Sequence, residues 1–210
     1  MLLSLPIEIL IVLLPILMFS LSFHEFSHGY MAYRLGDNTA ARNGRLTLNP
    51  LAHLDPIGSL MILFVGFGWA KPVPVNPVNF SNPRVDMIKV AIAGPASNLI
   101  LAFISGTLIR LNGHTGLLNN STFISVLELF TWINIALAVF NMLPIAPLDG
   151  SQIFGNIISK NNPDIAWKLQ IYGPKILMGI ILIGLITPFS LLGTIMMPFI
   201  KLFMYIFAGI

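Results

Sequence analysis

The sequence predicts an all-α polytopic membrane protein. We expect a core of three transmembrane helices, a broken C-terminal helical segment, and a small β or re-entrant element between the first two helices. Composition is the first reason: 56% of the 210 residues are hydrophobic and 9% are charged, whereas a soluble domain carries about 25% charged residues. The second is that four long stretches lack Asp, Glu, Lys and Arg, and the third is a Gly- and Pro-rich segment between the first two of them.

The charge-free stretches set the expected spans, because a helix that crosses a membrane needs about 20 mostly apolar residues. They run over residues 9–22, 90–109, 129–148 and 176–200. Within a single membrane-embedded domain over 1–210, we expect spans at about 5–35, 88–110, 124–144 and 176–207. Pro188 and Pro198 interrupt the last stretch, which predicts either one kinked span or a span followed by an interfacial helix.

The segment 36–86 differs from the spans because Gly and Pro interrupt it repeatedly. Its apolar run at 60–65 is too short to cross a membrane as a helix, so it predicts a strand or a re-entrant hairpin. The edge of such a strand could hold an unwound substrate segment. Asp55, directly before Pro56, predicts local turn chemistry.

The basic residues predict how the chain crosses the membrane. The positive-inside rule places the segments 36–86 and 150–175 in the cytoplasm and the N-terminus outside. No Lys or Arg precedes Arg34, so the start of the chain lacks the basic region of a secretory signal, and we expect it to remain as a span. The residues behind this orientation are Arg34, Arg42, Arg45, Lys71, Arg84, Lys89, Lys160, Lys168 and Lys175.

Charge pattern and cysteine content narrow the function classes. The basic residues form no run or stripe, so no nucleic-acid partner is expected. The chain has no Cys, which excludes disulfides and thiolate metal ligands.

The motif His24-Glu25-Phe26-Ser27-His28 carries the clearest chemical signal. On a helix, two histidines four residues apart share a face, so both imidazoles can bind one zinc ion. Glu25 lies beside that face, where its carboxylate can take a proton from an attacking water as general base. A five-residue pattern also occurs by chance, but this one ends an apolar helix, where ionisable residues are costly and usually functional. We therefore expect one Zn²⁺ per chain.

A catalytic zinc takes three protein ligands and keeps one position open. Asp149 ends the third charge-free stretch, on the same expected side of the membrane as the two histidines. Pro144 and Pro147 precede it and are expected to unwind the helix end, which would let the carboxylate turn towards a metal. From spacing alone, a metal ligand and an aspartate that only ends a helix in a turn are equally favoured.

Three motifs taken together resemble the site-2 protease family of intramembrane metalloproteases. They are HEFSH at 24–28, GPASN at 94–98 and NMLPIAPLDG at 141–150, and the resemblance covers about residues 20–150 in the order typical of the family. It implies that His24, His28 and Asp149 bind zinc and that Glu25 is catalytic. It also implies a three-helix core. The chain resembles compact members, with no inserted PDZ-like segment and no room for a nucleotide-binding regulatory domain.

Other site residues are implied or left open. The resemblance implies that Asn141 helps to hold the substrate backbone and that Asn98, Gly94 and Pro95 shape the site. From the residues alone, Asn98 could equally bond a neighbouring helix, and Gly94 with Pro95 could permit a kink or a close helix approach. His53 could support or gate the site, or take part only in turn chemistry.

The expected function is hydrolysis of peptide bonds in or near transmembrane segments of other membrane proteins, which with lipid are the expected partners. We expect an integral protein of a bacterial or archaeal cell membrane with its active site towards the cytoplasm. One alternative is a zinc-binding membrane pseudoprotease without hydrolytic activity, although zinc binding alone does not require Glu25. A zinc transporter would need polar residues spread through several spans, whereas these gather at one end.

Overall fold

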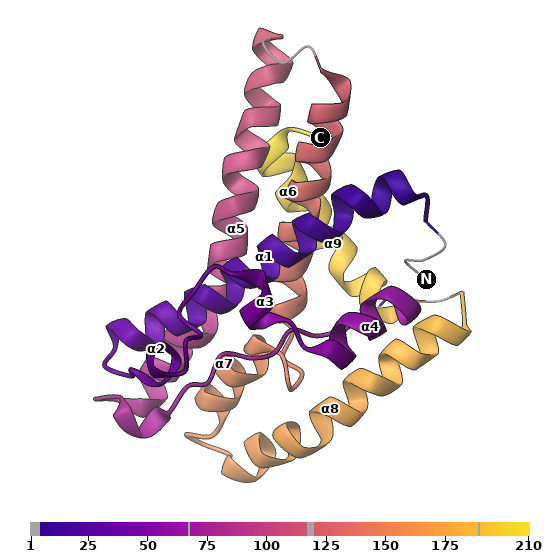
Figure 1. Cartoon of the computed structure of the whole chain (residues 1–210). Helices are drawn as coiled ribbons and strands as arrows, with labels where there is room; N and C mark the ends of the chain where they lie inside the picture. Colours follow the sequence, from indigo (N-terminus) through magenta and orange to yellow (C-terminus); the bar gives the residue numbers. More distant parts are fainter. Residues whose placement is uncertain (1–4, 67, 117–119, 189) are drawn as a thin grey trace. The chain divides into compact units, whose positions relative to one another are not determined.

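The computed structural model describes residues 5–66, 68–116, 120–188 and 190–210. The chain divides into two compact units, 1–86 and 87–210, and each is described by itself. Figure 1 labels the helices of both units, coloured along the sequence. The prediction of a single domain is not tested by this division and stays a prediction.

The first unit is built on one long helix, α1 (Ile7–Arg34). Pro6 precedes it, and Arg34 in its last turn suits the negative end of the helix dipole. Gly36 ends it with a φ of +104°, a backbone conformation that side chains with a Cβ rarely adopt. The helix continues without a break through residues 24–28, so the HEFSH motif lies inside α1, as the sequence predicts.

Among the described residues of the first unit, four short helical elements follow α1, and α1 packs on two of them, α2 and α3. Asn49 caps α3 by accepting a hydrogen bond from the Leu51 N–H (3.1 Å). The elements are α2 (Thr39–Arg42), α3 (Pro50–His53), α4 (Pro56–Val65) and the 3₁₀ turn η2 (Pro77–Asn79).

The expectation of a strand at 60–65 is wrong, because these residues belong to helix α4. Asp55 caps the helix through the Gly58 N–H (2.7 Å), Pro56 occupies its first turn, and Gly66 closes it with a φ of +82°. A short apolar run alone does not distinguish a strand from a helix, but these capping signals at both ends favour a helix. The turn chemistry predicted for Asp55 is confirmed. Among the described residues, the β structure is one isolated antiparallel bridge between Leu54 and Ala70.

In the part of the second unit that the structure describes there are five helices, of which α5 begins at the end of the first unit. Its core lies where α5, α6 and α9 meet, around Ala102, Ile135 and Ile200. Gly106 of α5 allows α9 to come close, since a Cβ there would lie 2.7 Å from the Cβ of Phe207. The helices are α5 (Pro83–Thr115), α6 (Ser121–Asn141), α7 (Asp149–Ile158), α8 (Pro163–Ile186) and α9 (Leu191–Ala208).

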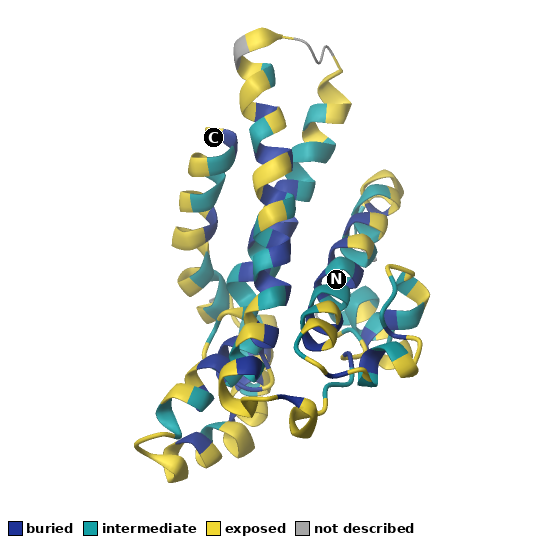
Figure 2. Cartoon of the chain, turned by 90° about the vertical axis from the view of Figure 1, so that its left-hand side faces the viewer, coloured by how far each residue is buried: buried dark blue, intermediate teal, exposed yellow. Residues whose placement is uncertain are grey.

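Five of the described helices are long and apolar enough to cross a membrane: α1, α5, α6, α8 and α9. Exposed positions recur along all of them (Figure 2), and many carry large apolar side chains, which suits contact with lipid. The expected break in the C-terminal segment is present, because α8 ends two residues before Pro188. A full further helix follows instead of a kink, and Pro198 lies within it. The chain thus has more candidate spans than the expected three-helix core and broken segment.

Candidate metal centre

His24 and His28 meet on one face of α1, as their spacing predicts. Their Nε2 atoms are 3.0 Å apart, and the two rings are nearly perpendicular, at 82°. Both side chains are buried. Two imidazole nitrogens that converge at a buried point on a rigid helix can serve together as ligands of one metal ion.

This pair fits zinc. Tetrahedral zinc with Zn–N bonds of about 2.0–2.1 Å holds two nitrogens about 3.3 Å apart, close to the observed separation of 3.0 Å. Imidazole nitrogen is a preferred zinc ligand, and neutral rings can turn both lone pairs to one cation.

Glu25 follows His24 on α1 and is held from outside the helix. Its Oε2 accepts a hydrogen bond from the backbone N–H of Val73 (2.9 Å). Val73 lies between Pro72 and Pro74 in the segment 71–76, which is neither helix nor strand. This contact is not predictable from the sequence, in which a backbone donor between two prolines is visible but its target is not.

His53 is buried in the first unit, with both ring nitrogens engaged. Its Nε2 lies 2.8 Å from the Thr47 carbonyl, and its Nδ1 lies 3.4 Å from Nη2 of Arg45. Because a guanidinium only donates, Nδ1 must accept, so the proton is on Nε2 and donates to Thr47. His53 therefore supports the surrounding loops. A direct role at the substrate stays a prediction.

Asp37 lies three residues after α1, and the pKa of its carboxyl group is shifted. Burial alone would raise the pKa of its carboxyl. Hydrogen bonds from Thr39, Asn76 and Asn79 outweigh this and leave the pKa below its usual value of 3.8. Asp37 is therefore held as a carboxylate.

In the second unit, Asp149 occupies the first turn of α7, where its charge suits the positive end of the helix dipole. The chain between α6 and α7 is non-helical over 142–148, so the unwinding expected from Pro144 and Pro147 is confirmed. Gly150 fits closely against that stretch, because a Cβ there would lie 2.3 Å from the Met142 carbonyl oxygen. Asp149 and the histidines belong to different units, so its role as a ligand stays a prediction.

The remaining expected site residues lie on α5 and at the end of α6. Asn98 donates from Nδ2 to Oδ1 of Asn134 (2.8 Å), which shows the helix-pairing contact that the sequence left open. Gly94 accepts a hydrogen bond from Ser97 Oγ (2.7 Å) one residue before Pro95. Asn141, the last residue of α6, donates to the Leu137 carbonyl (2.9 Å). Their roles at a substrate stay predictions.

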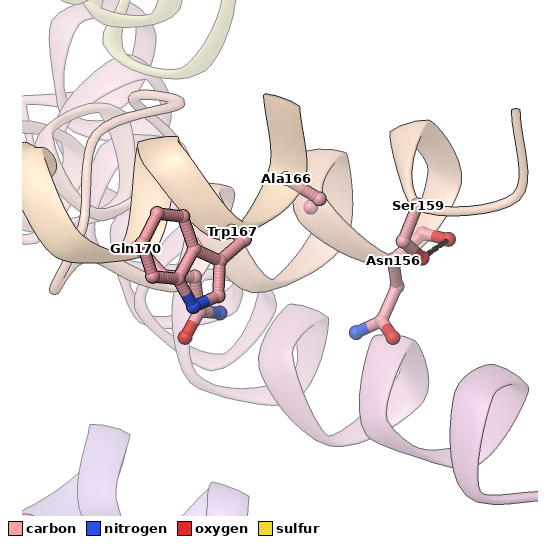
Figure 3. A pocket seen from close by; sticks show the side chains of 6 residues that line it. Asn156, Ser159, Ala166, Trp167 and Gln170 are labelled. Carbon is pink, nitrogen blue, oxygen red and sulfur yellow. Dashed lines mark hydrogen bonds between the residues drawn. The ribbon is translucent and has the colours of Figure 1, made fainter. Parts of the chain in front are cut away.

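A cavity of about 240 Å³ lies between α7 and α8 (Figure 3). The Ser159 hydroxyl at its edge donates to the backbone carbonyl of Asn156 (3.1 Å). None of the lining residues carries an imidazole or a carboxylate, so the cavity offers neither a metal ligand nor an acid–base group. The residues that line the cavity are Gly155, Asn156, Ser159, Ala166, Trp167 and Gln170.

Comparison with known proteins gives consistent results. Peptidase family M50 matches residues 109–184. The protein named "Putative zinc metalloprotease YwhC" of Bacillus subtilis is 46% identical over 157 residues, which cover 73% of this chain and 72% of YwhC. "Putative zinc metalloprotease Rip2" of Mycolicibacterium smegmatis is 33% identical over 150 residues, covering 69% of this chain and 55% of that protein.

Rip2 of Mycobacterium tuberculosis H37Rv is 34% identical over 140 residues, which cover 62% of this chain and 51% of Rip2. The chain thus matches only about half the length of the Rip2 proteins. No solved structure matches the chain significantly. The match to YwhC extends over most of both chains and agrees with the apolar helices found here. The chain is therefore an integral membrane protein that belongs to peptidase family M50, the site-2 protease family.

Proposed function

We propose that the chain is an intramembrane zinc metalloendopeptidase, which hydrolyses peptide bonds in or near transmembrane segments of other membrane proteins. The observation that carries this proposal is the pair of buried imidazoles 3.0 Å apart beside Glu25, on a helix able to cross a membrane. The names of YwhC and Rip2, each given as "Putative zinc metalloprotease", support it.

His24 and His28 would hold one zinc ion per chain, with Asp149 as the third ligand. Carboxylate oxygen is a usual partner of two histidines at catalytic zinc, and three protein ligands leave one position open. When bound, zinc supplies a Lewis acid that activates water and polarises the peptide carbonyl. The position of Asp149 in the first turn of α7 fixes the start of its side chain on a rigid element.

Glu25 would serve as general base. Its carboxylate takes a proton from water as the water oxygen bonds to the carbonyl carbon, and it returns that proton to the nitrogen when the C–N bond breaks. The two carboxylate oxygens have different surroundings, since Oε2 accepts the hydrogen bond from Val73 N–H. Oε1 therefore remains for the proton.

The substrate would be held by residues of the second unit. Asn141 uses one N–H for the Leu137 carbonyl, which leaves its Oδ1 and second N–H for an unwound substrate backbone. Gly94, Pro95 and Asn98 would shape the wall of the site. The predicted contact between a substrate and a strand edge at 60–65 is withdrawn, because the backbone of α4 is bonded within the helix.

The test combines zinc content with cleavage of a model transmembrane substrate by purified protein. Glu25→Gln is expected to keep zinc and lose cleavage, and Asp149→Ala is expected to lose both. Unchanged cleavage in Glu25→Gln would remove Glu25 from the mechanism. Wild-type protein that binds zinc but cleaves none of a panel of transmembrane substrates would favour the pseudoprotease.

A further inference from the structure

The segment 71–76, Lys-Pro-Val-Pro-Val-Asn, forms neither helix nor strand and contacts α1 in the first unit. We infer that the backbone N–H of Val73 is a positioning group for Glu25, and that the segment 71–76 serves to hold this N–H in place. The inference deepens the proposed function and rests on it, because positioning matters only if Glu25 transfers a proton.

The hydrogen bond between Val73 N–H and Glu25 Oε2 (2.9 Å) joins residues 48 positions apart. Within the described part of the chain, no other group donates to the Glu25 carboxylate. Pro72 and Pro74 have no N–H, so Val73 supplies the backbone donor of residues 72–74. The prolines also keep this stretch out of a helix, in agreement with its lack of regular structure.

The first end of the segment is fixed at Lys71. Its N–H donates to the His53 carbonyl (2.8 Å), and its carbonyl accepts from Nη2 of Arg45 (2.6 Å). Arg45 is 8% exposed, and its Nε has no hydrogen-bond partner among the described residues. Burying a guanidinium is costly unless it is well paired, so this placement indicates that fixing Lys71 matters.

The second end is fixed at Asn76. Its N–H donates to Oδ2 of Asp37 (2.8 Å), and the Asn79 side chain donates to Oδ1 of the same carboxylate (2.7 Å). Asp37 is fully buried. Charge-assisted bonds of this kind are stronger than neutral ones, so the segment is held at both ends.

Between these ends, Val73 packs over Gly29, one helical turn beyond Glu25. A Cβ built on Gly29 would lie 3.1 Å from Cγ1 of Val73, so the segment lies closer to α1 than a residue with a Cβ would ordinarily allow. The bond therefore fixes one carboxylate oxygen in advance of the reaction. Catalytic groups held in this way need not be ordered during proton transfer.

The first test uses three variants in the full chain. Val73→Pro removes the N–H between two residues that are already proline, and Val73→Ala keeps it. Val75→Pro is the matched control, because nothing in the described part of the chain accepts a hydrogen bond from Val75 N–H. We expect Val73→Pro to lower kcat by about 10- to 100-fold, the range seen when supporting partners of a site are removed. KM and zinc content should stay near wild type.

Val73→Ala should retain kcat within about threefold, and Val75→Pro should match wild type, so that the loss follows the N–H and not the side chain or the added ring. An unchanged or increased kcat in Val73→Pro would overturn the inference. An increase would mean that the segment restrains Glu25 instead of preparing it.

The second test does not depend on activity. Labelling proline carbonyl carbon and valine nitrogen selects, by NMR, the amides of Val73, Val75 and Val78, the three valines that follow proline. Glu25→Ala should shift the Val73 amide signal and speed its hydrogen exchange at least about tenfold. The Val78 amide, bonded to the Asn76 side chain, is the internal control. An unresponsive Val73 amide would overturn the inference, whereas a responsive one in an inactive protein would count against the proposed function alone.

Discussion

Asn98 and Asn134 join α5 to α6 by a hydrogen bond of 2.8 Å between two side chains that are both 0% exposed. Asn134 also donates to the Phe130 carbonyl of its own helix (2.9 Å), which fixes the orientation of its amide. Further along both helices, Ser105 of α5 and Thr131 of α6 form a second polar contact of 2.7 Å. Polar contacts of this kind hold helices together where lipid offers no hydrophobic drive.

Replacement of either asparagine by alanine should destabilise the pair, since the other amide then remains buried without this partner. We expect each single change to lower the free energy of unfolding in detergent by about 1–2 kcal/mol. The double variant should lose less than the sum, with a coupling of about 0.5–1.5 kcal/mol. Additive losses would show that the two amides do not act as a pair.

Gly150 offers a test of how the start of α7 is held. An alanine Cβ there would lie 2.3 Å from the Met142 carbonyl oxygen and 2.4 Å from that of Leu143, and backbone atoms cannot yield as a side-chain end can. We expect Gly150→Ala to cost about 2 kcal/mol or more in stability and to weaken zinc retention, because Asp149 must shift with its neighbour.

The matched control is Gly155→Ala on the same helix, where nothing lies within 4 Å of the new Cβ. That change should stabilise the protein by up to about 1 kcal/mol through helix propensity. Thermal unfolding and metal analysis of both variants check the prediction. If Gly150→Ala behaved like Gly155→Ala, the close approach of α7 to the 142–148 stretch would not exist in solution.

Gly29→Ala should separate stability from catalysis. Alanine favours a helix interior over glycine by about 0.8–1 kcal/mol, but its Cβ would meet Cγ1 of Val73 at 3.1 Å and push the segment 71–76 outward. We expect unchanged or higher thermal stability together with cleavage reduced about threefold to tenfold, since a displaced Val73 N–H holds Glu25 less well. Full activity in Gly29→Ala would mean that the segment tolerates displacement.

The chain has no Cys, so its orientation can be tested with single cysteines. Asn120 lies between α5 and α6, and Asn161 lies between α7 and α8. The expected orientation places Asn120→Cys outside and Asn161→Cys in the cytoplasm. A thiol reagent that cannot cross membranes should label the first in intact cells and the second only after permeabilisation. The reverse pattern would invert the proposed orientation.

Much of this arrangement is readable from the sequence because it depends on local signals. Histidine spacing on a helix fixes the convergence of His24 and His28, and the prolines at 144 and 147 fix the end of α6. The apolar run at 60–65 is ambiguous because length and hydrophobicity do not separate a short strand from a short helix. The capping signals at Asp55, Pro56 and Gly66 do separate them, and they indicate the helix α4.

The contacts that support the site were not predictable, because they join residues far apart in the chain. Neither composition nor periodicity reveals that Val73 N–H reaches Glu25, or that Asp37 binds Asn76. Arg45 illustrates the same limit, since burial of a charged residue is decided by the loops that surround it and runs against its ordinary preference.

Asp37 gives the last prediction, on stability against pH. Its folded-state pKa lies below 3.8, because bonds from Thr39, Asn76 and Asn79 outweigh the effect of burial. A lowered folded pKa contributes stability above the unfolded value, and this contribution is lost as pH falls through the folded pKa. The wild-type protein should therefore lose stability below about pH 4.

The variant Asp37→Asn lacks this carboxylate. Its side-chain NH₂ group would face one of the N–H groups that the carboxylate accepts from in the wild type. It should be less stable by about 1–3 kcal/mol at pH 7, with a shallower decline below pH 4. Thermal unfolding between pH 3 and pH 7 measures both, and parallel pH curves for the two proteins would show that Asp37 contributes no such term.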